Sequence, residues 1–301
     1  MPLYPSNKTA ARKPTICITA GDPAGIGPEI IKKALADRAL ARSADFVFFG
    51  FEKLKGLSRK KCALASVGFI KEAVDCIKKG RAQALVTGPV SKESISEAGI
   101  RFIGQTEYLA RLSGSKKAAM MFVSPRLRVG LVTRHVRLAD VKRNISRDSI
   151  GDAVCLVHRA LKDLFGIRRP RIGISGLNPH CGEGGLIGDE EKKVIAPAVK
   201  LLRRRLSGLR GPIPADVLLY EAYNGVFDAV VCMYHDQGLA PFKMVARNEG
   251  VNLTLGLPFI RTSPDHGTGF DIAGKGIADP GSMKEAIKLA VRLSHAYRIK
   301  N

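Results

Sequence analysis

The sequence predicts an α/β fold. Short apolar runs alternate with longer stretches whose apolar residues recur every three or four positions, which is the pattern of strands followed by helices. The chain has 301 residues, enough for two domains at ~100–200 residues each. Hydrophobic residues make up 45% of the chain and charged residues 25%, as in an ordinary globular protein. No run reaches the roughly 18 apolar residues of a membrane span.

The expected elements follow one another along the whole chain. Runs with the length and apolar content of strands are Thr15–Ala20, Asp45–Phe49, Ala84–Thr87, Ala118–Val123, Arg128–Val132, Arg171–Ser175, Ala229–Met233 and Val251–Leu255. Stretches with helical periodicity are Pro28–Ala41, Phe69–Lys79, Thr106–Leu112, Ser149–Leu164, Glu190–Leu206 and Ser282–Tyr297. No linker rich in Pro, Gly or Ser divides the chain, so two domains would be joined by crossing segments.

Charge is the unusual feature of the composition. Lys and Arg number 49 against 27 Asp and Glu, which gives a formal net charge of +22 and suggests a nucleic-acid partner. The basic residues are scattered, however, the chain has no Trp, and aromatic residues do not alternate with the basic runs as single-strand binding favours. A basic solvated surface that attracts small anionic substrates is therefore the preferred interpretation, and nucleic-acid binding ranks well below it.

Three further observations point to the cytoplasm. The first fourteen residues lack the apolar stretch of a signal peptide. The chain offers no membrane segment. Its six cysteines include no C-x-x-C pair, so they are expected to be small core residues and not disulfides or a zinc ribbon. We expect a cytoplasmic protein without a membrane partner.

Four of the six histidines lie just beyond strand-like runs: His135, His180, His235 and His266. Ligands of α/β sheets gather beyond the carboxyl ends of strands, so imidazoles from separate strand ends can converge there. Three neutral imidazoles with an open fourth position suit a catalytic divalent metal such as zinc. Neighbouring polar residues, Asn178 and Asp236 among them, can fix the imidazole tautomers. The alternative is that each histidine is a hydrogen-bonded structural residue, which is favoured for any one of them but not for the group.

A glycine-rich turn spans Gly21–Glu29, between an expected strand and an expected helix. Its backbone N–H groups and the positive end of the helix favour an anion, which makes Gly21, Asp22, Gly25 and Gly27 candidates for cofactor contact. The turn matches neither G-x-G-x-x-G nor a P-loop, and such turns are often only structural. The cofactor-binding residues are otherwise unknown from the sequence.

Cationic and amide side chains follow the motif HDQG at intervals: Lys243, Asn252 and Arg261. Arg261 can grip a carboxylate or phosphate with two hydrogen bonds. Lys243 can act as a point charge toward the same ligand. Each cation taken alone is more often a surface residue.

These segments together resemble the 4-hydroxythreonine-4-phosphate dehydrogenase family of vitamin B6 biosynthesis. The matching stretches are GDPAGIGPE, ALVTGPVSK, TEYLA, ISGLNPHCGEGG, PADVLL, CMYHDQGLAPFK and VNLTLGLPFIRTSPDHGTGFDIAGKG. The resemblance implies an isocitrate/isopropylmalate-dehydrogenase-like fold, with two α/β/α domains and the active site in the cleft between them. We expect residues 1–107 and 267–301 to form one discontinuous domain. Residues 108–266 would form a central domain with the metal histidines and the dimer interface.

The resemblance also implies particular site residues. A divalent metal, whether zinc, magnesium or cobalt, is expected on His135, His180 and His235, which leaves His266 outside the metal set. Substrate contacts are expected from Gln105, Thr106, Lys243, Asn252 and Arg261, and the acidic positions Asp216 and Asp236 are the candidate catalytic residues. Gln105 stands where the family commonly has a histidine; glutamine can still donate a hydrogen bond, but it cannot become cationic.

The implied reaction is the NAD- or NADP-dependent and metal-dependent oxidation of 4-phosphooxy-L-threonine to 2-amino-3-oxo-4-phosphooxybutanoate. That product decarboxylates to 3-amino-2-oxopropyl phosphate. The implied assembly is a homodimer with active sites at its interface. The departure at Gln105 leaves open a related phosphorylated four-carbon sugar acid, threonate or erythronate 4-phosphate, as the substrate. A three-histidine metal site alone is also compatible with a metal hydrolase or an acyltransferase acting on phosphorylated small molecules.

Overall fold

The computed structural model describes residues 13–51 and 56–298, and these fall into two compact units. Within the described residues, the central unit consists of residues 119–247, and the discontinuous unit consists of residues 13–51, 56–118 and 248–298. Residues 1–12, on which the expectation about a signal peptide rests, lie outside the described residues. Within the described ranges, no helix combines the length and the apolar character that crossing a bilayer demands.

The discontinuous unit has a mixed sheet in the order β2-β1-β3-β10-β9. Its strands are β1 (Thr15–Thr19), β2 (Asp45–Phe49), β3 (Ala84–Thr87), β9 (Val251–Leu255) and β10 (Ile260–Pro264). Its helices are α1 (Gly27–Leu35), α2 (Arg38–Ala41), α3 (Arg59–Lys78), α4 (Lys92–Glu97), α5 (Gln105–Ser113) and α11 (Gly281–Arg298). All neighbouring strands pair in parallel except β9 and β10, which are antiparallel.

The central unit has a sheet in the order β4-β5-β8-β6-β7. Its strands are β4 (Ala119–Val123), β5 (Arg128–Leu131), β6 (Ile172–Ser175), β7 (Leu209–Ile213) and β8 (Ala229–Cys232). Its helices are α6 (Val141–Asn144), α7 (Arg147–Asp163), α8 (Ala196–Arg203), α9 (Ala215–Tyr223) and α10 (His235–Ala246), with shorter helical turns η1 (Leu138–Asp140), η2 (Pro179–Gly185) and η3 (Glu191–Ile195). Strands β5, β8 and β6 are parallel neighbours.

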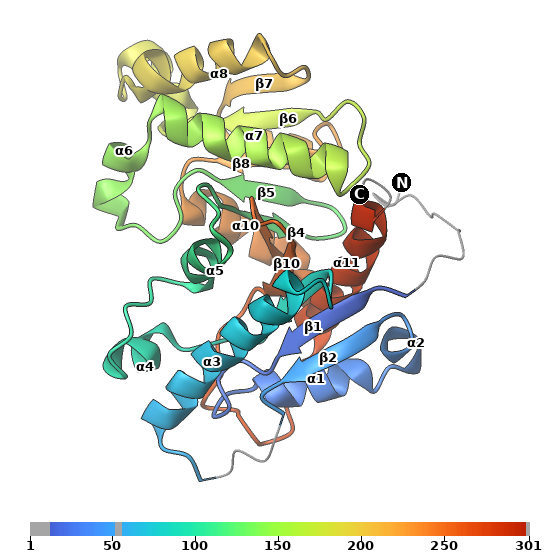
Figure 1. Cartoon of the computed structure of the whole chain (residues 1–301). Helices are drawn as coiled ribbons and strands as arrows, with labels where there is room; N and C mark the ends of the chain where they lie inside the picture. Colours follow the sequence, from blue (N-terminus) through green and yellow to red (C-terminus); the bar gives the residue numbers. More distant parts are fainter. Residues whose placement is uncertain (1–12, 52–55, 299–301) are drawn as a thin grey trace. The chain divides into compact units, whose positions relative to one another are not determined.

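Helices α7 and α10 cover opposite faces of the central sheet (Figure 1). Gly130 of β5 faces α7, because a Cβ on it would lie 2.6 Å from Val157 Cγ2. Its neighbour Val129 faces α10, since a Cβ on Gly238 would lie 2.6 Å from Val129 Cγ1. Successive strand residues point to opposite faces, so the two helices must lie on either side of β5. The missing side chain at Gly238 lets the first turn of α10 sit directly on the strands.

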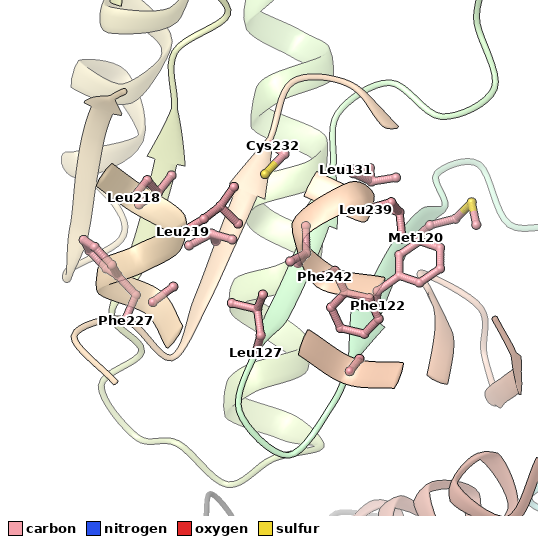
Figure 2. Close-up of a cluster of buried hydrophobic side chains, with 14 residues drawn as sticks. Met120, Phe122, Leu127, Leu131, Leu218, Leu219, Phe227, Cys232, Leu239 and Phe242 are labelled. Carbon is pink, nitrogen blue, oxygen red and sulfur yellow. The ribbon is translucent and has the colours of Figure 1, made fainter. Parts of the chain in front are cut away.

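A buried hydrophobic cluster fixes α10 on the sheet (Figure 2). The rings of Phe122 on β4 and Phe242 on α10 meet edge to face, with centroids 5.7 Å apart. Phe242 is fully buried, which stabilises the fold by about 1.5–3 kcal/mol relative to an exposed ring. Because α10 begins at His235, this packing also sets where that imidazole stands.

The expected strands are all present with bounds within one residue of those predicted, and the α/β class is confirmed. Strand β7 was not expected, nor were helices α4, α6, α9 and α10, and β10 was anticipated only as the strand-like run before His266. The sequence of β10, IRTSP, reads as polar although all five residues are buried. The stretch Pro28–Ala41 forms two helices, since Asp37 is non-helical and caps the second with its side chain. All six cysteines are free, as expected, but only Cys17, Cys62 and Cys232 are buried in the core. Cys76 and Cys181 are partly buried and Cys155 is exposed, so the expectation of a core position is wrong for these three.

The chain passes from one unit to the other at residues 118/119 and 247/248, whereas the expected boundaries are 107/108 and 266/267. The difference has a physical cause in the pairing of elements. Strand β10 pairs with β3 and with β9, which ties residues 251–264 to the discontinuous unit. Helix α5 packs against α3, which ties it to the same unit.

Candidate active site

Three of the histidines follow three adjacent strands of the central unit. His135 lies shortly after β5, His235 shortly after β8, and His180 in the turn η2 after β6. These strands are parallel neighbours in the order β5-β8-β6, so their carboxyl ends lie at one edge of the sheet. Ligands of α/β sheets gather at this edge.

His135 and His235 are brought together directly. Their ring centroids are 5.5 Å apart, with the planes inclined at 39°. Two imidazoles that bind one zinc ion through Zn–N bonds have ring centres roughly 5 Å apart, so this spacing suits a shared ion. Asp236 Oδ1 lies 2.6 Å from His235 Nδ1, which leaves His235 Nε2 as the nitrogen available to a ligand.

Gln237 ties the ends of β8 and β6 together. Its Oε1 accepts hydrogen bonds from the Met233 N–H at 2.7 Å and from the Ser175 hydroxyl at 2.9 Å. Its Nε2 donates to the carbonyl of Gly176 at 2.8 Å. The amide therefore links the two backbones just before His235 and His180.

His180 lies in a left-handed turn. The φ angles of His180, Cys181, Gly182, Glu183 and Gly184 are all positive, from 41° to 77°. This conformation costs each non-glycine residue roughly 1–2 kcal/mol, so it persists only where the surroundings enforce it. Strain of this kind is typical of functional sites.

Two buried acidic residues hold the start of this turn. Glu191 accepts hydrogen bonds from the backbone N–H groups of Leu177 and Asn178 and from the Asn178 side chain. Glu190 accepts a hydrogen bond from the same Asn178 amide and pairs with Lys142. These partners, the Lys142 ammonium first among them, lower the pKa of Glu190 to about 2.

His180 does not complete a metal cluster with the other two imidazoles inside one chain. Among residues 13–51 and 56–298, no three His, Cys, Asp or Glu side chains are close enough together to hold a metal ion. The donors are of the right kind for a divalent metal, and two of them are adjacent. Asp216, at the start of α9, is exposed. Burial raises the pKa of Cys181, beside His180, and the charges of Glu191 and, last, Asp216 add to the shift.

In the discontinuous unit, Arg261 is a buried cation. It is 2% exposed, and its guanidinium donates hydrogen bonds to Thr87 Oγ1 at 2.6 and 3.2 Å, to Thr254 Oγ1 at 3.0 Å and to Gln105 Oε1 at 2.9 Å. All these acceptors are neutral. Burial lowers the pKa of Arg261 to about 9, and the charge of Glu107 opposes the shift.

The other side chains expected to bind substrate differ in how far they are already engaged in hydrogen bonds or buried. Gln105 is committed at both ends, because its Nε2 also donates to the Gly88 carbonyl at 3.1 Å. Thr106 is 4% exposed in the first turn of α5. Asn252 lies on β9 on the same face as Thr254, and its Oδ1 is buried without a hydrogen-bond partner. Lys243 is an exposed residue of α10, in the central unit.

The glycines of the 21–29 turn are explained by the chain's own packing. A Cβ on Gly21 would lie 2.3 Å from the Pro89 carbonyl oxygen, one on Gly27 2.0 Å from that of Ala20, and one on Gly25 2.8 Å from that of Thr268. Asp22 is different, because it is fully buried and its Oδ2 has no hydrogen-bond partner. Burial raises the pKa of Asp22. Asp22 is thus the member of the turn with an unused acceptor.

Comparison with known proteins agrees with this architecture. Residues 31–290 match the family described as pyridoxal phosphate biosynthetic protein PdxA. The isocitrate dehydrogenase of Methylococcus capsulatus has the same fold, with a TM-score of 0.54 at 14% identity over 94% of this chain and 87% of that one. The fold is therefore isocitrate-dehydrogenase-like, as predicted.

Closer relatives define the family. A protein of Sulfurihydrogenibium named 4-hydroxythreonine-4-phosphate dehydrogenase is 41% identical over 92% of this chain and 98% of its own length. A crystal structure of the protein of that name from Klebsiella pneumoniae has a TM-score of 0.82 at 35% identity, covering 94% of this chain and all of that one. A putative D-threonate 4-phosphate dehydrogenase of Oceanobacillus iheyensis is 37% identical over 94% and 99% of the two chains. The chain belongs to the PdxA family, and the predicted resemblance and oxidoreductase class are confirmed.

Several residues that build the site were not anticipated from the sequence. Gln237 stands inside the motif HDQG, so its position between the histidine and the glycine was a usable signal. Thr87 and Thr254, which hold Arg261, lie on strands and have no pattern of their own. Glu190 and Glu191 lie at the start of a stretch expected to be a plain amphipathic helix, and nothing local distinguishes them.

The buried cation predicts an anion site that phosphate can probe. Inorganic phosphate is expected to raise the midpoint of thermal unfolding of the wild-type protein by about 2–4 °C at roughly tenfold over its dissociation constant. Arg261→Met should abolish this shift, because the anion would lose its charged partner. Exposed Arg101 offers the matched control, Arg101→Met, which should keep it. Equal shifts in both variants would show that phosphate binds elsewhere.

Proposed function

We propose that this chain is a 4-hydroxythreonine-4-phosphate dehydrogenase that oxidises 4-phosphooxy-L-threonine with NAD or NADP in the presence of a divalent metal. The product is 2-amino-3-oxo-4-phosphooxybutanoate, which loses carbon dioxide to give 3-amino-2-oxopropyl phosphate. The observation that carries the proposal is Arg261, a buried cation surrounded by neutral acceptors in a chain of this family.

The phosphate of the substrate is assigned to Arg261. A guanidinium without an acidic hydrogen-bond partner is costly to bury, and an incoming phosphate would supply the missing charge. Gln105 holds the guanidinium through Oε1 as a neutral acceptor, so it does not compete with phosphate for the positive charge. The buried acceptor of Asn252 can take a hydrogen bond from a hydroxyl or amino group. Thr106 and exposed Lys243 complete the proposed contacts.

The metal is assigned to His135, His180 and His235. A bound divalent ion would polarise the substrate hydroxyl and lower its pKa. Nitrogen donors from three neighbouring strand ends fit such an ion, and zinc, cobalt and magnesium are the candidates. Asp236 accepts from His235 Nδ1 and so fixes the tautomer and orientation of that ring.

The proton of the substrate hydroxyl needs an acceptor. Asp236 is engaged with His235, which leaves exposed Asp216, whose charge acts on Cys181 beside His180, as the better of the two candidate bases. The nicotinamide cofactor, when bound, accepts the hydride. The unused Asp22 Oδ2 is the proposed acceptor for a cofactor hydroxyl. Gly21, Gly25 and Gly27 shape the turn around it.

A second candidate substrate is D-threonate 4-phosphate or the related erythronate ester. The Oceanobacillus relative carries a name of this kind, and Gln105 departs from the histidine usual in the family. The two substrates differ at C2, where one has an amino group and the other a hydroxyl.

The proposal predicts metal-dependent reduction of NAD or NADP by the purified protein with 4-phosphooxy-L-threonine. A chelator should abolish the reaction, because it removes the ion that would polarise the substrate hydroxyl. Added zinc, cobalt or magnesium should restore the reaction. The measurement is the absorbance of the reduced nicotinamide, compared between this substrate and D-threonate 4-phosphate. A higher kcat/KM for the threonate ester would favour the second candidate. Full activity in the chelated protein would contradict the metal role.

We further propose that the protein is a homodimer joined through the central unit. Large apolar side chains are exposed in the central unit: Leu138 at 74%, Leu186 at 88%, Tyr220 at 73% and Met244 at 76%. Soluble proteins rarely leave so many large apolar residues uncovered unless a partner covers them. A second copy of this chain is the proposed partner, and it would bring further histidines to the site edge.

The dimer is testable with one substitution. Leu186→Asp should convert the protein from twice the chain mass of 32.5 kDa to a monomer, because burying an unpaired carboxylate at the interface is costly. Light scattering coupled to size exclusion measures the mass. Leu201→Asp is the control, since Leu201 is 52% exposed on α8, away from the histidine segments, and this variant should stay dimeric. A wild-type monomer, or a dimer that survives Leu186→Asp, would contradict the proposal.

A further inference from the structure

The backbone at the start of the left-handed turn that carries His180 is held by the buried carboxylate of Glu191. Glu191 is 4% exposed, and its Oε1 accepts from the N–H groups of Leu177 and Asn178 at 2.7 and 2.8 Å. Its Oε2 accepts from the Asn178 side-chain amide at 2.9 Å. Two hydrogen bonds thus fix the backbone two and three residues before His180, and the third fixes the Asn178 side chain.

The carboxylate is also enclosed tightly by the turn. A Cβ on Gly176 would lie 3.0 Å from Glu191 Oε1, and one on Gly182 would lie 2.9 Å from its Oε2. The two glycines flank His180 in sequence, so the chain wraps around Glu191 before and after the histidine. A side chain at either glycine would displace this carboxylate.

The other end of the turn closes on itself and on a lysine. The Ile187 N–H donates to the Gly182 carbonyl at 3.1 Å, and the Lys192 ammonium donates to the Gly184 carbonyl. Lys192 follows Glu191 directly in η3. The same short helical turn therefore supplies contacts to both ends of the strained segment.

The hydrogen-bond pattern demands an acceptor at both oxygens of residue 191. All three partners are N–H donors, which an ionised carboxylate satisfies completely. A glutamine of the same shape would direct its NH₂ group either at two backbone N–H groups or at the Asn178 amide. Glutamine would thus keep the volume of the side chain but would no longer offer a hydrogen-bond acceptor to all three N–H donors.

We propose that Glu191 is a positioning residue for the metal site: it fixes Leu177 and Asn178 at the start of the left-handed turn His180–Gly184 and so places the His180 imidazole for metal binding. Asn178 extends this role by joining Glu191 to Glu190, which Lys142 anchors in turn. Residues that orient a metal ligand contribute strongly to the affinity for the metal, although they do not touch the ion. The inference rests on the metal binding proposed above.

The test compares Glu191→Gln with wild type by titrating Co²⁺ or Zn²⁺ into the metal-free full-length protein against a chromophoric chelator. Glu191→Gln should weaken metal binding by about 10–100-fold, the loss typical of residues that orient a ligand. Glu183→Gln removes a carboxylate from the same turn whose side chain is exposed, and it should bind as tightly as wild type. Unchanged metal affinity in Glu191→Gln would overturn the proposal.

A second measurement does not depend on metal. Hydrogen exchange of the metal-free proteins should be faster in residues 176–187 of Glu191→Gln than of wild type, because glutamine leaves at least one of the three N–H donors facing its NH₂ group and so weakens the hold on the turn. Asn178→Ala should show a smaller change in the same direction, which keeps the test open if Glu191→Gln does not fold. Unchanged exchange in this segment in the variant would overturn the positioning role. If the wild-type protein binds no metal, while hydrogen exchange is still faster in Glu191→Gln than in wild type, the metal assignment is overturned and the positioning role of Glu191 stands.

Discussion

The parallel order β5-β8-β6 is the constraint on which the site depends. Three strands that run the same way side by side must end at the same edge of the sheet, so whatever follows them is gathered there. Each of the three is followed within a few residues by a histidine. The absence of a side chain at Gly238 lets α10 sit directly on β5 and β8, and Gln237 locks the backbone ends of β8 and β6 together. Packing and hydrogen bonds within the chain thus form the sheet edge at which the histidines lie, without help from a ligand.

A second constraint operates in the discontinuous unit. Because successive residues of a strand face opposite sides, β10 turns Thr262 toward α11, where its hydroxyl donates to the Ala286 carbonyl. Arg261 must then face the other side, among Thr87, Thr254 and Gln105. The fold carries the cost of a buried cation that has only neutral hydrogen-bond partners. The phosphate that we propose as its ligand would offset that cost.

Much of this was accessible from the sequence, and the exceptions have physical reasons. The histidines could be placed at strand ends because apolar runs mark the buried strands, and the motifs identified the family. Strand β10 was anticipated only as a run before His266 because its buried residues are polar, which is the kind of local inconsistency that functional sites introduce. The left-handed turn at His180 was invisible, since its conformation is imposed by Glu191, from a segment that reads as an ordinary helix. Asp22 was a candidate only as part of a turn, and its buried, unpaired Oδ2 among the described residues separates it from the three glycines, which are also buried.

The central claim is that His135, His180 and His235 share one divalent ion, with ligands drawn from a single chain or from two copies. Crystals of the protein grown with zinc, and measured on both sides of the zinc absorption edge, test it directly. We expect an anomalous zinc peak within bonding distance of one copy each of His135, His180 and His235, whether these come from one chain or from two subunits. Ordered zinc at some other place, with no peak at these rings, would contradict it.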